Sequence, residues 1–564
     1  MRKYLIILMS LPILVYTQGQ LPGYSQDIFD INGIKTSLGQ RGFMWDLSDA
    51  KFEVPKGGGI NSIFAHEYWM GGVDDGGQLK VAAMTYRQGG VDLWPGPVSP
   101  VNQGQLSSPT WDRVWKINKT QIDSHINYSS TISYIIPEVI ENWPAHGDTS
   151  MGQAFYLAPF VDVDNNGVYN PFLGDYPQIK GDQALYMIRN DVGNIHTESE
   201  ADALGIEQHI MFYGYLCIDN PAVNHALFVD MKIYNRSGGN INDFYLGTWL
   251  DAELGYYLDD YVGCDVEKDL GFVYNGDSED EGYTGYSTAL CVNNSPTIPP
   301  PAQGLVYLNQ SMSKFMYYNN DNTVTGNPIN GFDYYNYLRG IWKDNVPMTF
   351  GGNGHGAGVG TTNDASNYMF PGTTDPAFPG QDWSEATAGN LPADRRFIMS
   401  VGPVDLIAGD VFSLDYAFVF AWDSITPNQS PGNLIFPATG STALLFDYVD
   451  TIKAVYLDPS ILNCYNPGCT DLSAVNYNPS ATLNDGSCCY IGGCRDVTAI
   501  NYDPNALCED GSCTYIGVEI TRLSGTGNNG IALEMKDESI DDIFNSIEHR
   551  VLKPTYNKGQ GPVD

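Results

Sequence analysis

Basic residues are scarce in this sequence. Its 564 residues include 28 lysines and arginines but 66 aspartates and glutamates, which gives a formal net charge of −38. Such a chain supplies few contacts for phosphate groups, so we expect no nucleic-acid partner, and anionic membrane surfaces are disfavoured for the same reason. The acidic composition instead favours cation binding or solubility in a salty medium.

Common catalytic signatures and long helical patterns are also lacking. None of the eight histidines belongs to an H-E-x-x-H motif, and no G-x-S-x-G nucleophile elbow is present. Glycine (61 residues) and proline (33 residues) are frequent, and aromatic residues make up 12% of the chain. Turn-forming residues between short apolar segments are typical of β proteins, so the sequence predicts a mainly β fold.

A long apolar run occurs only at the N-terminus. Arg2 and Lys3 precede an apolar stretch from Leu5 to Val15, which is short for a membrane span. We interpret residues 1–18 as a secretory signal peptide, with an uncleaved anchor or a buried strand as the alternatives. We therefore expect an extracellular or cell-surface protein with no membrane span after signal removal.

Residues 19–463 form a large region with strand patterns. Between residues 225 and 234, apolar side chains occupy alternate positions, at Leu227, Val229, Met231 and Ile233. Residues 411–422 alternate at first and then become apolar at every position, which indicates a strand buried on both faces. Ile63–Met70 and Gln78–Tyr86 read as a hairpin connected by Gly71–Gly77. These patterns predict a large β-sandwich-type N-terminal region of one or two subdomains.

Seven of the ten cysteines lie between residues 464 and 513. Residues 464–515 contain two copies of one unit with a 25-residue period, GCTDLSAVNYNPSATLNDGSC (Gly468–Cys488) and GCRDVTAINYDPNALCEDGSC (Gly493–Cys513). So small a unit cannot bury a sufficient core, so we predict two small disulfide-stapled repeats, with the pairs Cys469–Cys488 and Cys494–Cys513. Each bond would close a loop of about twenty residues, worth about 3 kcal/mol.

The pairing of the other cysteines stays open at this stage. Cys489 and Cys508 could join the two copies, and Cys464 could pair with Cys217, Cys264 or Cys291. From residue 516 the composition changes again. We expect residues 516–564 to be the start of a further domain that continues beyond Asp564.

Several stretches resemble a known class of proteins. The two cysteine repeats resemble short repeats of large secreted bacterial surface proteins that are exported by type IX secretion. The N-terminal region resembles a region of such proteins at KFEVPKGGG (51–59), LAPFVDVDNNGVYNPFLGDYPQIKGDQALY (157–186), DDYVGCD (259–265) and DRRFIMSVGPVDLIAGD (394–410). The resemblance spans most of residues 40–515. It implies an extracellular, largely β, multidomain protein and brings no catalytic residue.

The stretch DVDNNGVYNPFLGDYP (162–177) carries the clearest candidate site. Asp162, Asp164 and Asn166 occupy positions one, three and five of a calcium-binding loop, Gly167 provides the sharp turn, and the carbonyl of Val168 falls at position seven. Position twelve is Leu173 rather than a bidentate glutamate, so the loop is not a standard EF-hand. We predict a related calcium loop closed by Asp175, with an ion-free Asx-rich turn as the alternative.

Two further groups of acidic side chains are weaker candidates. One group could form a second cation site, an acid pair for glycoside hydrolysis, or simply an acidic surface loop; it consists of Asp251, Glu253, Asp259, Asp260 and Asp265. The second group recurs in the two repeats. There, oxygens at equivalent positions could bind calcium or brace the loops as Asx turns; they belong to Asp471, Asn476, Asn478, Asp485, Asp496, Asn501, Asp503 and Asp510.

Two functions are compatible with these features. The first is a calcium-stabilised, non-enzymatic structural or adhesive protein of the cell surface, whose ligand would be a polysaccharide or another surface protein. The second is a carbohydrate-binding or glycoside-hydrolysing protein that uses the acidic group at residues 251–265. A hydrolase requires two carboxylates about 5–10 Å apart in a cleft with aromatic residues on its floor.

Overall fold

The computed structural model describes residues 25–46, 49–86, 90–100, 110–131, 133–276, 280, 282–283, 300–356, 360–423, 440–462, 464, 467–478, 481, 483–484, 486–509, 511–514, 519–522 and 531–534. The chain divides into two compact units, residues 1–465 and 466–564, and each is described by itself. The predicted signal peptide, residues 1–18, lies outside the described residues. None of the described helices is long and apolar enough to cross a membrane.

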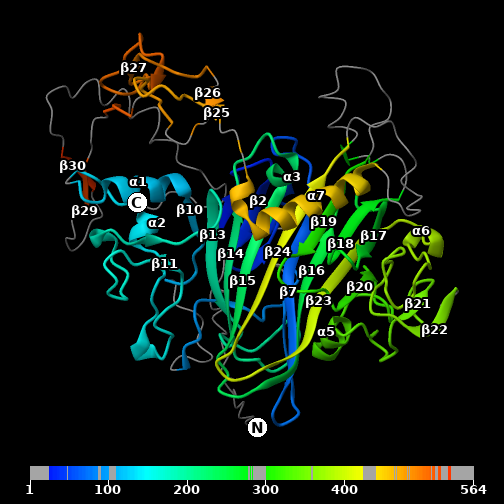
Figure 1. Ribbon diagram of the computed structural model, residues 1–564. Coiled ribbons are helices and arrows are strands. Elements are labelled where there is room, and N and C mark those ends of the chain that lie inside the picture. Colours follow the sequence, from blue (N-terminus) through cyan, green and yellow to red (C-terminus); the bar gives the residue numbers. More distant parts are fainter. Residues whose placement is uncertain are drawn as a thin grey trace, which may run out of the picture. The chain divides into compact units, whose positions relative to one another are not determined.

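Two large antiparallel sheets pack against each other in the first unit (Figure 1). The first sheet has the order β1 (Gln26–Phe29), β2 (Lys35–Gly39), β3 (Gly42–Phe43), β7 (Ile63–Asp74), β16 (Ile241–Ala252), β23 (Arg395–Leu406) and β20 (Lys314–Asn319). Within this sheet, β6 (Phe52–Glu53) pairs with β2, and β8 (Leu79–Ala83) pairs with β7. The mainly β, sandwich-like fold class is therefore confirmed.

The second sheet has the order β10 (Trp115–Asn118), β13 (Gln183–Asn190), β14 (Ile206–Gly214), β15 (Ala226–Asn235), β24 (Val411–Ala421), β19 (Ala302–Tyr307), β18 (Leu270–Asn275) and β17 (Asp260–Asp265), and β9 (Trp94–Pro95) pairs with β13. Smaller strands are β4 (Trp45–Asp46), β5 (Asp49–Ala50), β11 (Phe160–Val161), β12 (Tyr176–Pro177), β21 (Thr349–Gly351) and β22 (Thr361–Ala365). The helices of this unit are α1 (Lys119–Tyr128), α2 (Glu138–Glu141), α3 (Pro221–Asn224), α5 (Gly331–Leu338), α6 (Glu385–Ala388) and α7 (Gly440–Leu457).

The alternation expected from the sequence decides which face of the second sheet meets the first. The alternate apolar side chains of β15 lie in the core between the sheets, together with the large side chains of β24. The intervening small residues of β24 lie in a separate core on the opposite face, at Ala417, Val419 and Ala421. This strand is thus buried on both faces, as its composition predicts.

Helix α7 covers the outer face of the second sheet and packs on β24 and β19 (Figure 1). This helix of 18 residues is not among the elements expected from the sequence. Its fully buried side chains are Leu445, Val449, Ile452 and Val455, at intervals of four, three and three residues. That spacing is the helical period, so the signal was present in the sequence.

The hairpin of β7 and β8 differs from the expected one. Strand β7 continues to Asp74, so the connection is shorter than Gly71–Gly77. A Cβ atom at Gly71 would lie 2.6 Å from the ring of Tyr335 on α5, and one at Gly72 would lie 2.5 Å from Ile241. These two glycines therefore admit close neighbours within the strand and do not form a turn.

An ion pair crosses the core between the two sheets. Arg189 of β13 donates from Nη1 and Nη2 to the two carboxylate oxygens of Glu67 on β7, at 3.0 and 3.1 Å. Its Nε donates to Gln208 at 3.1 Å, and its guanidinium lies 4.7 Å from the centroid of the Phe43 ring. Both charged side chains are fully buried, so each charge depends on the other for compensation.

A second polar connection lies beside this pair. His66 Nδ1 is 2.8 Å from the carbonyl oxygen of Trp249, and its Nε2 is 2.7 Å from the hydroxyl of Tyr416 on the opposite sheet. Burial lowers the pKa of His66 to about 3, so the ring is neutral. Nδ1 therefore donates to Trp249, and Nε2 accepts from Tyr416.

Disulfides join distant parts of the first unit and build the second. Cys217 is bonded to Cys464 across 247 residues, and Cys264 is a buried free thiol. In the second unit, the two bonds predicted within the repeats are present, and a third joins the copies: Cys469–Cys488, Cys494–Cys513 and Cys489–Cys508. Its short strands are β25 (Pro467–Gly468), β26 (Leu483–Asn484), β27 (Gly492–Gly493), β28 (Cys508–Glu509), β29 (Glu519–Arg522) and β30 (Ile531–Glu534). Cys291 lies outside the described residues.

We predict that Arg189→Met destabilises the first unit by about 3–5 kcal/mol, because it leaves the Glu67 carboxylate buried without a cation. All ten tryptophans lie before residue 423, so tryptophan fluorescence during urea unfolding reports this unit alone. The matched control is Lys119→Met, which breaks the surface pair with Asp123 and should cost less than about 1 kcal/mol. Equal losses in the two variants would contradict the role of the buried pair.

Candidate functional site

The acidic loop, residues 162–175, connects the two strands of a short hairpin. Val161 at the end of β11 pairs with Tyr176 at the start of β12. Asp162 directly follows Val161, and Asp175 directly precedes Tyr176. The hairpin therefore brings the two ends of the loop together. The Val163 N–H donates to Asp175 Oδ1 at 2.8 Å across this junction.

Three carboxylates converge inside the acidic loop. One oxygen from each of Asp162, Asp164 and Asp175 lies within 4.8 Å of the other two. Asp175 is fully buried, whereas Asp162 is partly exposed and Asp164 is exposed. Carboxylate oxygens at this separation are the donors that hard divalent cations take from proteins, so the group could hold a metal ion.

Backbone amides already turn toward these carboxylates. Asp162 Oδ2 accepts from the N–H of Gly167 at 2.6 Å, and this bond contributes most to holding the pKa of Asp162 below its ordinary value. Asp175 Oδ2 accepts from the N–H of Asn170 at 2.8 Å. The bonds to Asp162 favour its charged form, which is the form that binds cations.

The turn at Gly167 requires glycine. Its φ is +80°, in the left-handed region, and a Cβ atom there would lie 2.9 Å from the hydroxyl of Tyr156. The preceding Asn165 also has a positive φ of +59°. The chain therefore reverses direction sharply at Gly167 and continues through Val168 toward Asp175.

Asn166 lies next to the carboxylate group, but its amide is engaged within the loop. Its Nδ2 donates to Asp164 Oδ2 at 2.7 Å, and its Oδ1 accepts from the Val168 N–H at 2.7 Å. The side chain of Val168 is 48% exposed, and only the Val168 carbonyl is expected to bind an ion. Asn166 and Val168 thus brace the turn through these hydrogen bonds.

The second acidic group separates into different places. Asp251 lies on β16 of the first sheet, whereas Asp260 and Asp265 lie at opposite ends of β17 in the second sheet. Asp265 accepts from the N–H of Lys268 at 3.0 Å and so caps the turn after β17. Among the described residues, the five carboxylates do not form a group close enough to share one ion.

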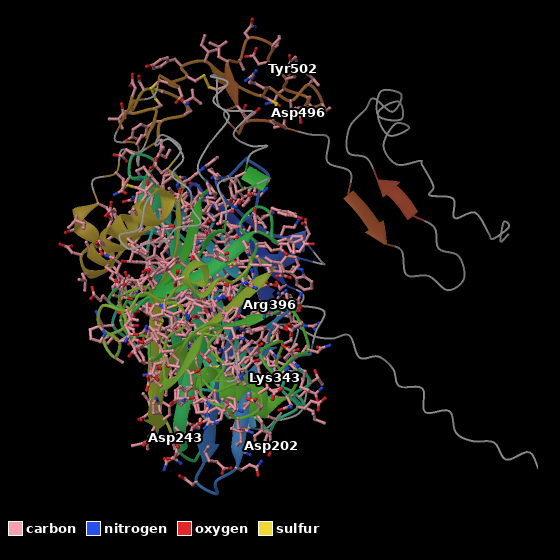
Figure 2. All side chains as sticks on the ribbon, turned by 90° about the vertical axis from the view of Figure 1, so that its right-hand side faces the viewer. Asp202, Asp243, Lys343, Arg396, Asp496 and Tyr502 are labelled. Atoms are coloured by element: carbon pink, nitrogen blue, oxygen red, sulfur yellow. A yellow bond between two sulfur atoms is a disulfide. The ribbon has the colours of Figure 1, made fainter. Side chains whose placement is uncertain are left out.

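Asp251 has a structural partner. Its Oδ2 accepts from Arg396 Nη2 at 3.0 Å and from the hydroxyl of Tyr86 (Figure 2 labels Arg396). Burial raises the pKa of Asp251 to about 7, and burial together with the nearby Asp251 charge raises the pKa of Glu253 to about 8. Asp251 and Arg396 therefore form a buried ion pair, and Asp251 does not belong to an open pair of acids.

The remaining acids of this group are buried beside one another. Asp259 accepts from Asn275 Nδ2 at 3.0 Å, and Asp260 Oδ2 accepts from the Leu254 N–H at 3.2 Å. Burial, followed by the Asp259 charge, raises the pKa of Asp260 well above its ordinary value. Three clefts in the part of the chain that the structure describes are not lined by any of the five predicted carboxylates.

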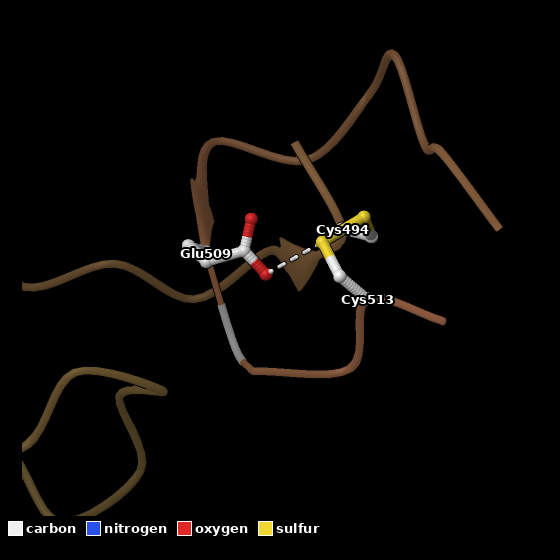
Figure 3. A group of neighbouring side chains, drawn as sticks. All are labelled: Cys494, Glu509 and Cys513. Carbon is white, nitrogen blue, oxygen red and sulfur yellow. Dashed lines mark hydrogen bonds between the residues drawn. A yellow bond between two sulfur atoms is a disulfide. The ribbon is translucent and has the colours of Figure 1, made fainter. Parts of the chain in front are cut away.

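A further cluster of potential metal-binding side chains consists of Cys494, Glu509 and Cys513 (Figure 3). The two cysteines are bonded to each other, and a Glu509 oxygen lies 3.3 Å from Cys513 Sγ. Disulfide sulfurs carry no proton and are not thiolates, so this group is not a metal site while the bond is intact.

Asparagines in the repeats brace the loops. Asn476 Oδ1 accepts from the N–H of Cys489, and Asn501 Oδ1 accepts from the N–H of Thr514, both at 2.7 Å. Asp471 and Asp496 accept from the backbone two residues further on, at Ser473 and Thr498. The two aspartate bonds are Asx turns, and the two asparagine bonds each connect positions 13 residues apart within the repeats. Asp485 and Asp510 lie outside the described residues.

Comparison with known proteins identifies no family. No family model and no curated protein matches the chain. Among solved structures, the crystal structure of a protein assigned as an aldose 1-epimerase from Escherichia coli K12 is similar over 71% of this chain and 99% of that chain, with 9% identity and a TM-score of 0.19. A similarity of this size carries no argument about activity.

We predict that Asp175→Ala loosens the acidic loop even without any cation, because Val163 and Asn170 lose the acceptor of their N–H groups. In chelator, amide hydrogen exchange of residues 160–177 should rise at least tenfold, which corresponds to about 1.4 kcal/mol of local stability. Leu173→Ala is the control, because this side chain is 58% exposed and accepts no hydrogen bond; amide exchange of the loop in chelator should change little in this variant. A loop that exchanges equally in both variants would contradict the assigned role of Asp175.

Proposed function

We propose that this chain is a non-enzymatic structural or adhesive protein outside the cell, with calcium bound in the acidic loop. The observation that carries the proposal is the convergence of Asp162, Asp164 and Asp175 around a loop that is otherwise rich in turns. Calcium would stabilise this loop, and the rigid sandwich would present it.

Calcium fits the donor set better than other common cations. The three converging side chains offer only carboxylate oxygens, and no histidine or cysteine among the described residues joins them. Oxygen-only sites suit calcium and magnesium, and calcium accepts irregular geometries with six to eight ligands. Asp175 would take the place of the glutamate that ends a standard loop, and Asn166 and the Val168 carbonyl are the next ligands that we propose.

Location outside the cell agrees with the covalent structure. Four disulfides are present in the described residues, and such bonds persist in oxidising compartments. The proposed signal peptide and the resemblance to surface proteins exported by type IX secretion support the same location. We propose a polysaccharide or another surface protein as the partner class of the whole molecule.

A glycoside hydrolase has less support. Asp251 is paired with Arg396, and Asp260 and Asp265 lie at opposite ends of one strand. Hydrolysis would need two carboxylates facing one accessible cleft, with one of them free to give or take a proton. We therefore do not propose the enzymatic alternative.

We predict that calcium stabilises the chain and that chelation removes this effect. At a free calcium concentration of 100 times Kd, one site adds about 2.7 kcal/mol, so the melting temperature in chelator should fall by several degrees. Asp162→Ala with Asp164→Ala should abolish the difference, as followed by calorimetric titration and thermal melts.

The matched control removes two exposed carboxylates elsewhere, with Asp364→Ala and Asp447→Ala. This variant has the same net charge as the loop variant and should keep the full response to calcium. A native chain with the same melting temperature in calcium and in chelator would refute calcium binding in the acidic loop.

A further inference from the structure

A cleft of about 740 Å³ opens at one end of the sandwich, away from every residue assigned above. Three segments form it: the β7–β8 hairpin of the first sheet, the connection from β13 to β14, and the connection from β15 to β16. Asp202 directly precedes Ala203, which lines one wall of the cleft, and it is labelled near the lower end of this unit in Figure 2. The volume is that of a site for a small ligand or a few side chains.

The walls of the cleft are fixed by polar contacts, which are buried on one side and exposed on the other. Asp191 is fully buried, and its carboxylate accepts from the N–H groups of Leu204, Gly205 and Ile206. On the facing side, Asp75 accepts from the backbone N–H and the side chain of Asn240, at 3.3 and 3.2 Å. The cleft is therefore largely formed before a ligand arrives, which lowers the entropic cost of binding.

The interior of the cleft is apolar. The aliphatic side chains that line it belong to Val192, Ile195, Ala203, Leu204 and Ile241. Ile195 is 80% exposed, so its side chain is available for contact. None of the described residues lining the cleft is aromatic, so it lacks the ring surface on which sugars commonly stack.

The rim of the cleft is acidic. Asp74 and Asp75 line it, and hydrogen bonds, first from the backbone N–H of Gln78 and of Asn240 respectively, hold the pKa of each below its ordinary value. Among the described residues of the lining, Lys80 is the only basic one, and it is shared between Asp74 at 3.7 Å and Asp202 at 3.3 Å. Asp75 adds a carboxylate to the same rim, so three carboxylates accompany one ammonium group and the rim keeps a negative charge.

We propose that this cleft binds a segment of a partner protein that presents a lysine or arginine beside an aliphatic side chain. The cation would meet Asp74 and Asp75, and the aliphatic group would cover Ile195 and the apolar floor. Charge complementarity selects this occupant, because the rim repels polyanions and also repels a second copy of this acidic chain. The site is independent of the acidic loop, so this binding does not need calcium.

The test uses two fluorescein-labelled eight-residue peptides, one alternating leucine and lysine and one alternating leucine and glutamate, with the full chain. Fluorescence anisotropy should show binding of the leucine–lysine peptide and at least tenfold weaker binding of the other. Asp74→Asn with Asp75→Asn should weaken the first peptide at least tenfold, because both cation partners are lost. Ile195→Ser should weaken it about threefold without affecting the fold, because this side chain is exposed.

The control variant is Asp364→Asn with Asp447→Asn, which removes the same charge from exposed positions outside the cleft. It should change peptide affinity less than twofold, and chelator should leave affinity unchanged. Equal weakening by the cleft and control variants would reduce the effect to general attraction and overturn the proposal. Absence of binding at 1 mM peptide, or a change of oligomeric state in the cleft variant without a change in peptide affinity, would also overturn it.

Discussion

The packing of the two sheets depends on one buried charge pair, because either side chain without the other would be an uncompensated charge in the core. Glu67 and Arg189 are both fully buried, 122 residues apart in sequence, and joined by two hydrogen bonds. A buried charge without its partner costs several kcal/mol, so alternative alignments of the sheets that separate these two side chains are strongly disfavoured. Hydrophobic contacts alone would tolerate such shifts more easily, because they are not directional. We therefore expect the pair to favour this alignment of the two sheets, together with the aromatic rings of Phe43 and Tyr68 that lie beside the Arg189 guanidinium.

The neutral histidine beside the pair acts in the same direction. His66 connects β16, through the Trp249 carbonyl, to Tyr416 on the opposite sheet. Because its folded pKa lies near 3, folding excludes a proton that the unfolded chain binds below about pH 6.5. This residue contributes stability that is present above the unfolded pKa and is lost as the pH falls toward 3. A fixed core of this kind leaves variation and binding to the connections at the ends of the sheets.

Much of the fold, but little of its long-range chemistry, could be predicted from the sequence. The alternation in β15 and β24 indicates both their strand structure and their buried faces, and the period of the cysteine repeats indicates their internal disulfides. The loop at residues 162–175 could be found because its acids are adjacent in sequence. The partner of Cys464 could be narrowed to three candidates but not decided, and the pair Glu67–Arg189 could not be found, because residue type and spacing carry no signal for partners 247 and 122 positions apart. The group at residues 251–265 misleads for the opposite reason, since neighbours in sequence fall on two different sheets.

The two proposed binding regions use negative charge in different ways. In the acidic loop, carboxylates converge to less than 4.8 Å, a separation at which a small divalent cation relieves their mutual repulsion. At the cleft, Asp74 and Asp75 accept hydrogen bonds from separate partners and lie at the rim of an apolar floor. Such a setting suits a monovalent cation on an organic stem, whose apolar part also gains from burial. We therefore infer that an excess of 38 negative charges can serve both solubility and two distinct cation chemistries, with the surroundings of the carboxylates deciding which cation each region prefers.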